Sequence, residues 1–485
     1  MSEAISAELY GQAWPCSGVA VNSRGTVYES RCAIAAVDQM LTGKSIALAG
    51  FYFLRRRETV TMLKISDVCV RRLARELGTP LQIFDQAAIE KQLSTAQENF
   101  RSEMFDTEVA YATKAFGCGA MYKIVNDAGA YLDVVSGGEM YGAHKAGMDM
   151  DRVFFHGNSK TEEEIEQALE LGCGTIVLDN IGEAEKLVRI SDKMEKGIDV
   201  VLRINPGIEA HTHEYVITAN IDSKFGISVK KTSDIHRVMS IVDDGRFLNF
   251  KGFHMHIGSQ ITDPDSFGKA IETMSAFADD ICERSGYAAE FISLGGGFGI
   301  KYTESDKPVP LGEMARYSIK KCEEVFGKAK VRPKRLCIEP GRSVVGEAGV
   351  SVYKVGYLKD TETLHYAFVD GGMSDNIRPA LYGSEYTCAI VNKENDEPKR
   401  HYCIAGKNCE SADIIIHDAF LPELHEGDYL IVYATGAYGY SMASNYNKCG
   451  RPPVVFVKDG EARLVIKRET YEDMTTLETD ERIEL

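Results

Sequence analysis

The sequence has no excess of positive charge and no long apolar run. It contains 55 Lys and Arg residues against 72 Asp and Glu residues, for a net charge of −17, and its one basic cluster is the short run RRR at 55–57. An acidic chain repels nucleic-acid phosphates and anionic lipid surfaces. The longest apolar run near the N-terminus, 46–54, is about half the length of a membrane span. We therefore expect neither a nucleic-acid partner nor a membrane partner.

A secretory signal and a disulfide pattern are also missing. Residues 1–10 carry Glu3 and Glu8 and lack the basic region and apolar core of a signal peptide. The 12 cysteines include no C-x-x-C pair and no short-chain disulfide rhythm, which is typical of free, mostly buried thiols in a reducing compartment. We therefore expect a cytoplasmic protein.

Composition and pattern divide the 485 residues into four segments. Residues 1–61 fit neither of the domains that follow, and Met62 begins a stretch typical of a domain start. Our hypothesis is that translation begins at Met62 and that 1–61 is not native; the alternative is a real but poorly packed extension. In the segment 62–105, a strand-like run at 80–85 precedes a helical stretch, and we expect it to join the sheet of the C-terminal domain. The two main domains are 106–342 and 343–485.

The segment 106–342 alternates short apolar runs with stretches of helical period, which is the pattern of parallel strands joined by crossover helices. Thr161 and Glu164 form the spacing of a capping box and predict the start of one such helix. The strands are expected at 108–113, 131–135, 152–156, 175–179, 199–205, 250–256, 290–295 and 335–339. Eight repeats in about 235 residues predict an α/β fold, a (β/α)8 TIM-type barrel, rather than an open doubly wound sheet.

The segment 343–485 changes in character to short Val-, Tyr-, Thr- and Gly-rich runs separated by turn residues. Examples lie at 350–358, 365–370, 400–405, 429–435 and 454–458. This pattern predicts a separate C-terminal antiparallel β-sandwich or barrel domain.

Reactive side chains and glycines follow most of the expected barrel strands. In a (β/α)8 barrel the catalytic groups lie at the C-terminal strand ends, and six of the eight ends carry Lys, His, Glu, Asp or Gly clusters. Glycines at 295–297 and at Gly341, next to Arg342, would let backbone N–H groups approach a phosphate. The glycine run does not match a dinucleotide-binding fingerprint, in either its spacing or the position of its acidic partner.

Lys114 ends the first expected strand between apolar neighbours. Such a lysine would be partly desolvated, which favours the neutral amine that attacks carbonyl groups. A phosphate site, an attacking lysine, a carboxylate and flat imidazole rings together describe pyridoxal 5'-phosphate (PLP) held as a Schiff base. The segment 106–342 would then be the PLP-binding domain.

Several motifs carry a resemblance to a known family. The chain resembles the fold-type III PLP-dependent decarboxylases, with their alanine racemase-like barrel, over about residues 64–456. The motifs are YATKA (111–115), DVVSGGE (133–139), HGNSK (156–160), SKFG (223–226), HMHIGSQ (254–260), LGGGFG (294–299) and EPGR (339–342). The motifs IRPALY (377–382), CES (409–411) and GAYGYSMASNY (436–446) are similar to the diaminopimelate decarboxylase family in particular.

The resemblance implies roles for the residues at these positions. Lys114 would carry PLP as a Schiff base, His256 would stack on its ring, and Glu339 would contact its pyridine nitrogen. Further cofactor-binding residues would be Asp133, His156, Gly258, Ser259, Gly295, Gly296, Gly297, Gly341, Arg342 and Tyr438. Substrate would be bound by Arg342, Arg378, Tyr382, Glu410 and Tyr438.

The activity implied is decarboxylation of meso-2,6-diaminopimelate to L-lysine and CO2, the last step of lysine biosynthesis. Cys409 would be the second catalytic residue, protonating the carbanion. The resemblance also implies a homodimer, in which Cys409 and Glu410 reach the active site of the partner subunit. The chain departs from the family pattern at Phe116, Glu214 and Ala412, which puts local loop shape in doubt but removes no catalytic group.

Three alternatives remain at this stage. His254 and His256 share a strand face and could be a metal pair of a barrel hydrolase, although such a pair normally opens the first strand. We otherwise expect no metal site. A non-catalytic decarboxylase-like regulator would usually have lost the lysine or the acid. A decarboxylase for ornithine, arginine or carboxynorspermidine would have no use for Arg378, since its substrate has no distal carboxylate.

Overall fold

The computed structural model describes residues 20–21, 27–28, 63–208, 223–391, 393 and 396–483, and the chain divides into the units Met1–Thr61 and Met62–Leu485. In the first unit, β1 (Ala20–Val21) pairs antiparallel with β2 (Val27–Tyr28). The proposed start at Met62 and the departure at Glu214 lie outside the described residues.

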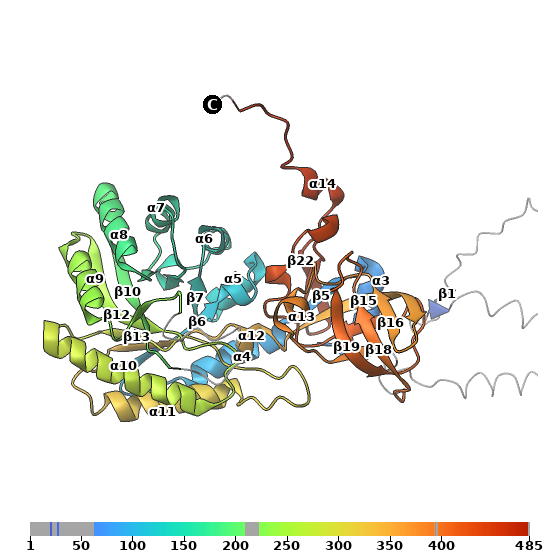
Figure 1. The fold of residues 1–485 in the computed structure, drawn as a ribbon, viewed down its shortest axis with the longest axis horizontal. Coiled ribbons are helices and arrows are strands. Elements are labelled where there is room, and N and C mark those ends of the chain that lie inside the picture. Colours follow the sequence, from blue (N-terminus) through green and yellow to red (C-terminus); the bar gives the residue numbers. More distant parts are fainter. Residues whose placement is uncertain are drawn as a thin grey trace, which may run out of the picture. The chain divides into compact units, whose positions relative to one another are not determined.

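Eight parallel strands form a closed barrel, so the predicted (β/α)8 fold is confirmed (Figure 1). The last strand pairs with the first, with Arg335 opposite Asp106, and this closes the circle. A short strand, β11 (Ile227–Ser228), adds to the side of β10. The barrel strands are β6 (Asp106–Ala112), β7 (Tyr131–Val134), β8 (Val153–Phe155), β9 (Thr175–Leu178), β10 (Ile198–Asn205), β12 (Leu248–Met255), β13 (Phe291–Ser293) and β14 (Arg335–Ile338).

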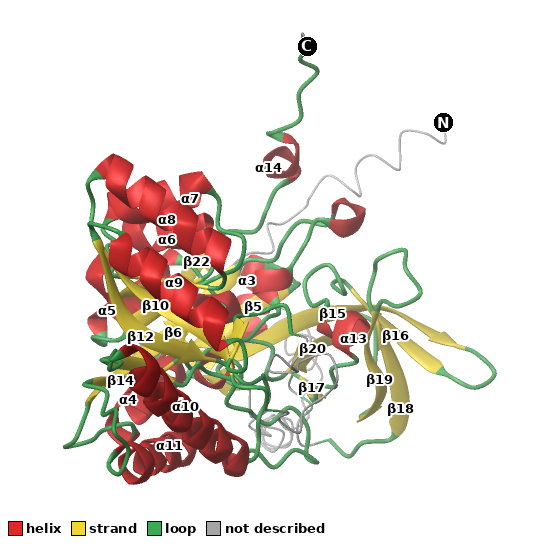
Figure 2. Cartoon of the chain, turned by 60° about the vertical axis from the view of Figure 1, so that its left-hand side comes forward, coloured by secondary structure: helices red, strands yellow, loops and turns green. Residues whose placement is uncertain are grey.

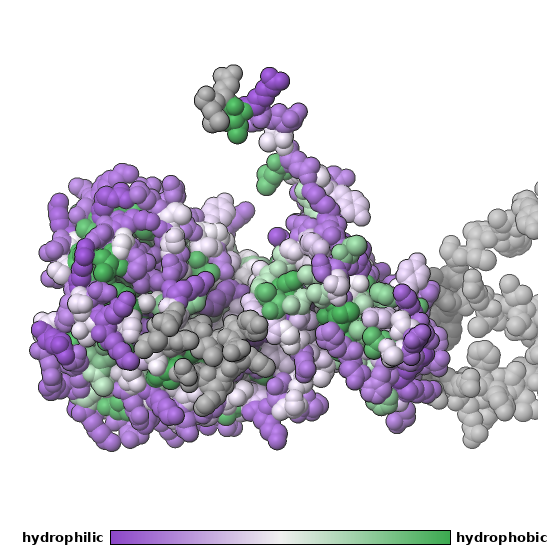
Figure 3. All heavy atoms as spheres, viewed as in Figure 1, coloured by the Kyte–Doolittle hydropathy of each residue, from purple (hydrophilic) through white to green (hydrophobic). Residues whose placement is uncertain are grey.

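Helices cover the outside of this barrel (Figure 2). The predicted capping box at the start of α7 is confirmed: Thr161 Oγ1 accepts a hydrogen bond from Glu164 N at 3.2 Å, and Thr161 N donates to Glu164 Oε2 at 3.1 Å. The helices are α4 (Gln86–Asn99), α5 (Gly119–Asp127), α6 (Gly137–Lys145), α7 (Glu162–Leu171), α8 (Ile181–Met194), α9 (Thr232–Asp244), α10 (Pro264–Ser285), α11 (Leu311–Phe326) and α12 (Arg342–Val345). Hydrophilic side chains cover most of their outer surface (Figure 3).

A second sheet of nine strands follows the barrel and includes one strand from before it. The strand β5 (Leu81–Asp85) pairs with β15 (Gly349–Asp360) and β21 (Val454–Lys458). The other strands are β16 (His365–Val369), β17 (Cys388–Ile390), β18 (Arg400–Ala405), β19 (Ile414–Leu421), β20 (Tyr429–Val432) and β22 (Glu461–Ile466). Most pairs are antiparallel, but β5–β21 and β16–β18 are parallel, because in each pair a long stretch of chain separates the two strands and lets them run the same way.

Small elements complete this sheet domain. A hairpin of β3 (Lys64–Ile65) and β4 (Val68–Cys69) leads into α3 (Val70–Leu77), and α14 (Tyr471–Thr475) follows β22. The short helix α13 (Arg378–Tyr382) lies between β16 and β17 and ends at Gly383, whose φ of +60° suits glycine at this position. This helix carries two of the residues expected to bind substrate.

Candidate active site

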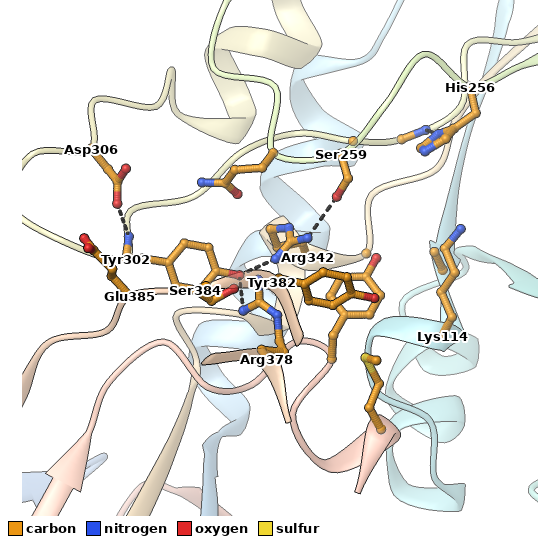
Figure 4. A pocket seen from close by; sticks show the side chains of 18 of the residues that line it. Lys114, His256, Ser259, Tyr302, Asp306, Arg342, Arg378, Tyr382, Ser384 and Glu385 are labelled. Carbon is orange, nitrogen blue, oxygen red and sulfur yellow. Dashed lines mark hydrogen bonds between the residues drawn. The ribbon is translucent and has the colours of Figure 1, made fainter. Parts of the chain in front are cut away.

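A cavity of about 520 Å³ lies at the C-terminal ends of the barrel strands (Figure 4). One part of its lining comes from the barrel, including Lys114, Asp133, His256 and Glu339. The other part comes from the sheet domain, including residues of α13 and Tyr438. The cavity therefore unites two parts of the chain that are far apart in sequence.

The floor of the cavity follows from the two-residue period of the strands. An apolar layer fills the barrel interior with Ala110, Phe154, Val177, Val201, Phe291 and Cys337, and Tyr131 packs against it. Side chains two positions further along a strand point to the same side. The next layer toward the cavity is therefore formed by Ala112, Asp133, His156, Asp179, Arg203, His254, Ser293 and Glu339. The barrel thus places a polar layer directly on top of an apolar one.

Glu339 is the centre of a hydrogen-bonded network in this polar layer. Its Oε2 accepts a hydrogen bond from His254 Nε2 at 2.9 Å, and its Oε1 accepts one from Ser293 Oγ at 2.6 Å. His156 Nε2 lies 3.5 Å from Oε1. Burial opposes ionisation of Glu339, but the charges of His254 and His156 and the two hydrogen bonds outweigh burial and lower its pKa. The floor therefore carries a fixed negative charge.

Asp133 and His156 are buried next to Glu339, but their pKa values are shifted toward the neutral forms. Burial, reinforced by the charge of Glu339, raises the pKa of Asp133 to about 8, and burial lowers the pKa of His156. Asp133 Oδ1 and His156 Nε2 lie 3.8 Å apart, and neither atom has a hydrogen-bond partner among the described residues. Unsatisfied buried polar atoms of this kind indicate that a ligand completes the site.

The suspected metal pair is split between two environments. His254 binds Glu339, whereas His256 Nδ1 accepts a hydrogen bond from the backbone N–H of Gly296 at 3.2 Å. The donors that do lie together are His156, His254 and Glu339, all buried and within 4.8 Å of one another, which is close enough to hold a metal ion. The geometry alone therefore leaves a metal site possible, with different residues from those expected.

Lys114 lies in the 3₁₀ turn η2 (Thr113–Ala115) at the end of β6, with its side chain exposed to the cavity. The prediction that sequence neighbours desolvate the Lys114 amine is wrong. The turn buries Thr113 and Ala115 and directs the Lys114 side chain away from them, into the cavity. The Ala115 carbonyl oxygen accepts hydrogen bonds from Tyr438 N at 2.8 Å and Ser441 Oγ at 3.0 Å. The sheet domain thereby holds the lysine turn in place.

Phe116 packs where the barrel meets the sheet domain. Its ring lies 4.3 Å from that of Phe84 in β5 and 6.1 Å from that of Phe456 in β21, measured between centroids. Its carbonyl oxygen accepts a hydrogen bond from Tyr111 at 2.8 Å. This departure from the family pattern therefore adds apolar packing behind the lysine turn and leaves the cavity lining unchanged.

The glycine run allows neighbouring strand ends to approach closely. A Cβ atom on Gly296 would lie 2.0 Å from the Glu339 carbonyl oxygen, and one on Gly297 would lie 2.2 Å from that of Gly258. Gly296, Gly297 and Gly341 line the cavity, whereas Gly258 and Gly295 do not. Any larger residue at 296 or 297 would push the strand ends apart, so backbone rather than side chains borders the cavity here.

Four residues that line the cavity form a chain of hydrogen bonds toward its outer part (Figure 4). Arg342 Nη2 donates to Ser259 Oγ at 2.9 Å, and Arg342 Nη1 donates to the hydroxyl of Tyr302. The same hydroxyl accepts a hydrogen bond from Arg378 Nη1 at 3.1 Å. Both arginines are buried, and neither forms a salt bridge within the described ranges.

Sequence reasoning missed part of this outer lining. Tyr302, Asp306, Gln260 and Glu385 were not expected to line the cavity, yet they do. The run KYTESD (301–306) is polar and has no periodic pattern, so it is typical of a solvent loop. Only Gln260 stood inside a recognised motif.

Cys409 and Glu410 do not line the cavity of a single chain. Both are exposed in the loop between β18 and β19, where Cys409 N donates to Asn447 Oδ1 at 2.7 Å. Asp413 anchors the loop by accepting hydrogen bonds from the backbone N–H groups of Met373 and Asn408 at 2.6 and 2.8 Å. Ala412 is exposed in this loop as well.

The comparisons with known proteins distinguish between the remaining interpretations. Residues 86–346 match the family model described as "Pyridoxal-dependent decarboxylase, pyridoxal binding domain". The diaminopimelate decarboxylase of Halalkalibacterium halodurans is 44% identical over 420 residues, covering 86% of this chain and 95% of the relative. That of Bacillus subtilis is 44% identical over 417 residues, with the same coverage of both.

The chain belongs to the diaminopimelate decarboxylase family.

A solved structure agrees with this membership of the diaminopimelate decarboxylase family. The crystal structure of diaminopimelate decarboxylase from M. jannaschii in co-complex with L-lysine matches with a TM-score of 0.79 and 31% identity, covering 86% of this chain and 97% of that one. The family-model match runs from α4 to the end of α12, so it spans the whole barrel. Within the described residues of this chain, none of the helices could serve as a membrane span.

Proposed function

We propose that this chain decarboxylates meso-2,6-diaminopimelate to L-lysine and CO2, the last step of lysine biosynthesis, with pyridoxal 5'-phosphate as its cofactor. The observation that carries the proposal is the pair Arg342 and Arg378, two buried guanidinium groups without a carboxylate partner in the described chain, in the same cavity as Lys114 and Glu339. A substrate with a second carboxylate suits this pair.

The cavity residues fit the cofactor. Lys114 supplies an amine, Gly296, Gly297 and Gly341 supply open backbone, and the negative charge of Glu339 suits a protonated pyridine nitrogen. The neutral ring of His256, whose pKa burial lowers, suits stacking on a flat heterocycle. We assign further contacts to the cofactor to Asp133, His156, Gly258, Ser259, Gly295, Arg342 and Tyr438.

When bound, the cofactor supplies an electron sink for the carbanion left by CO2. Lys114 would hold the cofactor and release it to the substrate amine. His254 and Ser293 would keep the Glu339 carboxylate ionised and correctly oriented, because both hydrogen bonds are to its oxygen atoms. Cys409 would donate a proton to the α-carbon.

The outer part of the cavity would bind the distal amino acid group of the substrate. Arg342 and Arg378 supply positive charge for its carboxylate, and Tyr382 and Tyr438 border the same space. We assign its ammonium group to Glu410. Glu385, which lines the cavity of the same chain, is the matched carboxylate for comparison.

We further propose a homodimer in which each subunit supplies Cys409 and Glu410 to the other's cavity. Support comes from their exposure on an anchored loop outside the cavity lining of their own chain. Apolar side chains also gather near α13 (Figure 3), and Leu381 and Phe420 are about half exposed there, at 48% and 53%. A contiguous exposed apolar patch often marks a protein–protein interface.

The test is CO2 release from a panel of diaminopimelate, lysine, ornithine, arginine and carboxynorspermidine. The proposal requires strong preference for diaminopimelate, dependence on added pyridoxal phosphate after its removal, and no loss of activity on treatment with a metal chelator. Preference for a substrate without a distal carboxylate would assign the chain a different activity. Activity that the chelator abolishes would restore the metal-hydrolase alternative at His156, His254 and Glu339.

A further inference from the structure

Tyr302 connects the two arginines of the cavity through a single oxygen atom (Figure 4). Its hydroxyl accepts hydrogen bonds from Arg342 Nη1 and Arg378 Nη1. The Tyr302 ring also lies beneath both guanidinium groups, with the Arg342 and Arg378 Cζ atoms 5.7 and 5.0 Å from its centroid. Two like charges that would repel each other are thus held at one neutral group.

The chain fixes Tyr302 in this place with hydrogen bonds on both sides. The Tyr302 and Thr303 backbone N–H groups donate to Asp306 Oδ2 at 3.0 and 2.8 Å. The Gln260 side chain bonds both to the N–H and to the carbonyl oxygen of Ile300, at 3.2 and 2.6 Å. The loop that carries Tyr302 therefore has a defined conformation beside the cavity.

The hydrogen-bonding capacity of a phenol decides what Tyr302 can still do. A phenolic oxygen has two lone pairs and one proton. The two arginines occupy the lone pairs, and within the described part of the chain the hydroxyl donates to no other protein group. Its proton is therefore available to an acceptor in the cavity that Tyr302 lines.

A second observation indicates that this acceptor is an anion. Arg342 is only 7% exposed, and its Nε atom has no hydrogen-bond partner in the described ranges. Leaving a buried charged donor unpaired is costly, so such donors are normally satisfied by a protein group, a water molecule or an ion. The unpaired Arg342 Nε and the available Tyr302 proton therefore belong to two residues that are joined by a hydrogen bond.

We propose that Tyr302 is a specificity-determining residue that donates its hydroxyl proton to the distal carboxylate of the substrate and holds Arg342 and Arg378 as one carboxylate-binding unit. This inference rests on the proposed function, because it assumes a ligand with a distal carboxylate. It assigns to Tyr302 the distinction between amino acids and the corresponding diamines. Tyr302 has no role at the reacting end of the substrate in this proposal.

The test compares L-lysine with cadaverine, two ligands that differ only by one carboxylate. Their binding to the pyridoxal phosphate-loaded enzyme is measured by calorimetry, which requires no turnover. Tyr302→Phe keeps the ring and removes only the hydroxyl. It should weaken L-lysine binding by about tenfold or more, the loss typical of a hydrogen bond to a charged group. Cadaverine binding should change by less than about twofold, because cadaverine has no carboxylate to accept the hydroxyl proton.

Tyr386→Phe is the matched control. Tyr386 is buried, accepts a hydrogen bond from Arg378 Nη1 at 2.7 Å and does not line the cavity. It should weaken L-lysine binding less than Tyr302→Phe, since it touches only one of the arginines and contacts no ligand. With diaminopimelate, Tyr302→Phe should raise KM by about tenfold and leave kcat and the cofactor absorbance nearly unchanged.

Several outcomes would overturn the inference. Equal weakening of L-lysine and cadaverine would make Tyr302 merely structural, as would an equal effect of Tyr386→Phe. If the wild-type enzyme binds L-lysine no more tightly than cadaverine, the carboxylate-binding unit does not exist. This outcome depends on no variant. If the wild type releases no CO2 from diaminopimelate but Tyr302→Phe selectively weakens L-lysine binding, the proposed function fails and the inference stands.

Discussion

The inner and outer parts of the cavity are built in different ways. The inner part is lined by residues at the ends of the barrel strands, such as Asp133 and Glu339, each less than 7% exposed and in contact with the buried His156. The outer part consists of loops and the short helix α13, with Tyr382 39% exposed. Closed barrels fix strand residues accurately, while loops vary without loss of the fold. Under the proposed function, the chemistry would therefore depend on the barrel strand ends and the choice of substrate on the loops and α13.

The largest expected effect tests the inner part. Lys114→Ala should reduce CO2 release to background and abolish the visible absorbance of the lysine-linked cofactor, since no other amine lines the cavity among the described residues. Absorbance spectra of the purified variant with added pyridoxal phosphate measure this directly. Persistence of the absorbance band would show that Lys114 is not the residue that binds the cofactor.

The next effect tests whether the outer part is complete in one chain. Cys409→Ala should slow turnover by about 10²–10⁴-fold, the usual contribution of a positioned proton donor, and leave the cofactor bound. Mixed with Lys114→Ala under conditions of subunit exchange, it should regain roughly a quarter of the wild-type activity, because half of the dimers then hold one intact site. A mixture as inactive as its components would show that each site uses one chain.

A smaller effect should separate the two parts by their kinetic signatures. Arg378→Ala should weaken diaminopimelate binding by about 2–5 kcal/mol, the cost of removing one partner of a buried charge pair. It should affect the KM for lysine as a decarboxylation substrate far less, because the single carboxylate of lysine then lies at the reacting end and not at Arg378. KM values for both substrates provide the measurement. Equal changes for the two would contradict the assignment of Arg378 to the distal carboxylate.

The smallest effect concerns the charge of the inner part. Burial raises the pKa of Asp133 to about 8, so its protonated form stabilises the folded chain below its ordinary pKa of 3.8, and this contribution is lost as pH rises toward 8. Glu339, with its lowered pKa, contributes in the opposite sense: its stabilisation is present above 4.5 and lost below it. Melting temperatures of cofactor-free Asp133→Asn should therefore fall less between pH 5 and 8 than those of the wild type. A parallel fall in both proteins would mean that Asp133 is ionised throughout.

Much of the inner part could be predicted from the sequence, because chain order and strand period fix it. His256 and Glu339 directly follow their strands, Lys114 follows its strand after one residue, and parallel strands must bring these ends to one rim. The pairing of His254 with Glu339 rather than with His256 could not be predicted, because it depends on which strand lies across the barrel. The exposure of Lys114 also required the turn geometry of η2.

By itself, the sequence determined the barrel, the reactive residues at its rim and the likeness to pyridoxal-dependent decarboxylases, since local period and motif spacing encode all three. The tertiary structure alone decided that Tyr302 joins Arg342 to Arg378. The physical reason is that these hydrogen bonds form between residues 40 and 76 positions apart in the sequence. Such contacts depend on how the two domains pack, which no local pattern records.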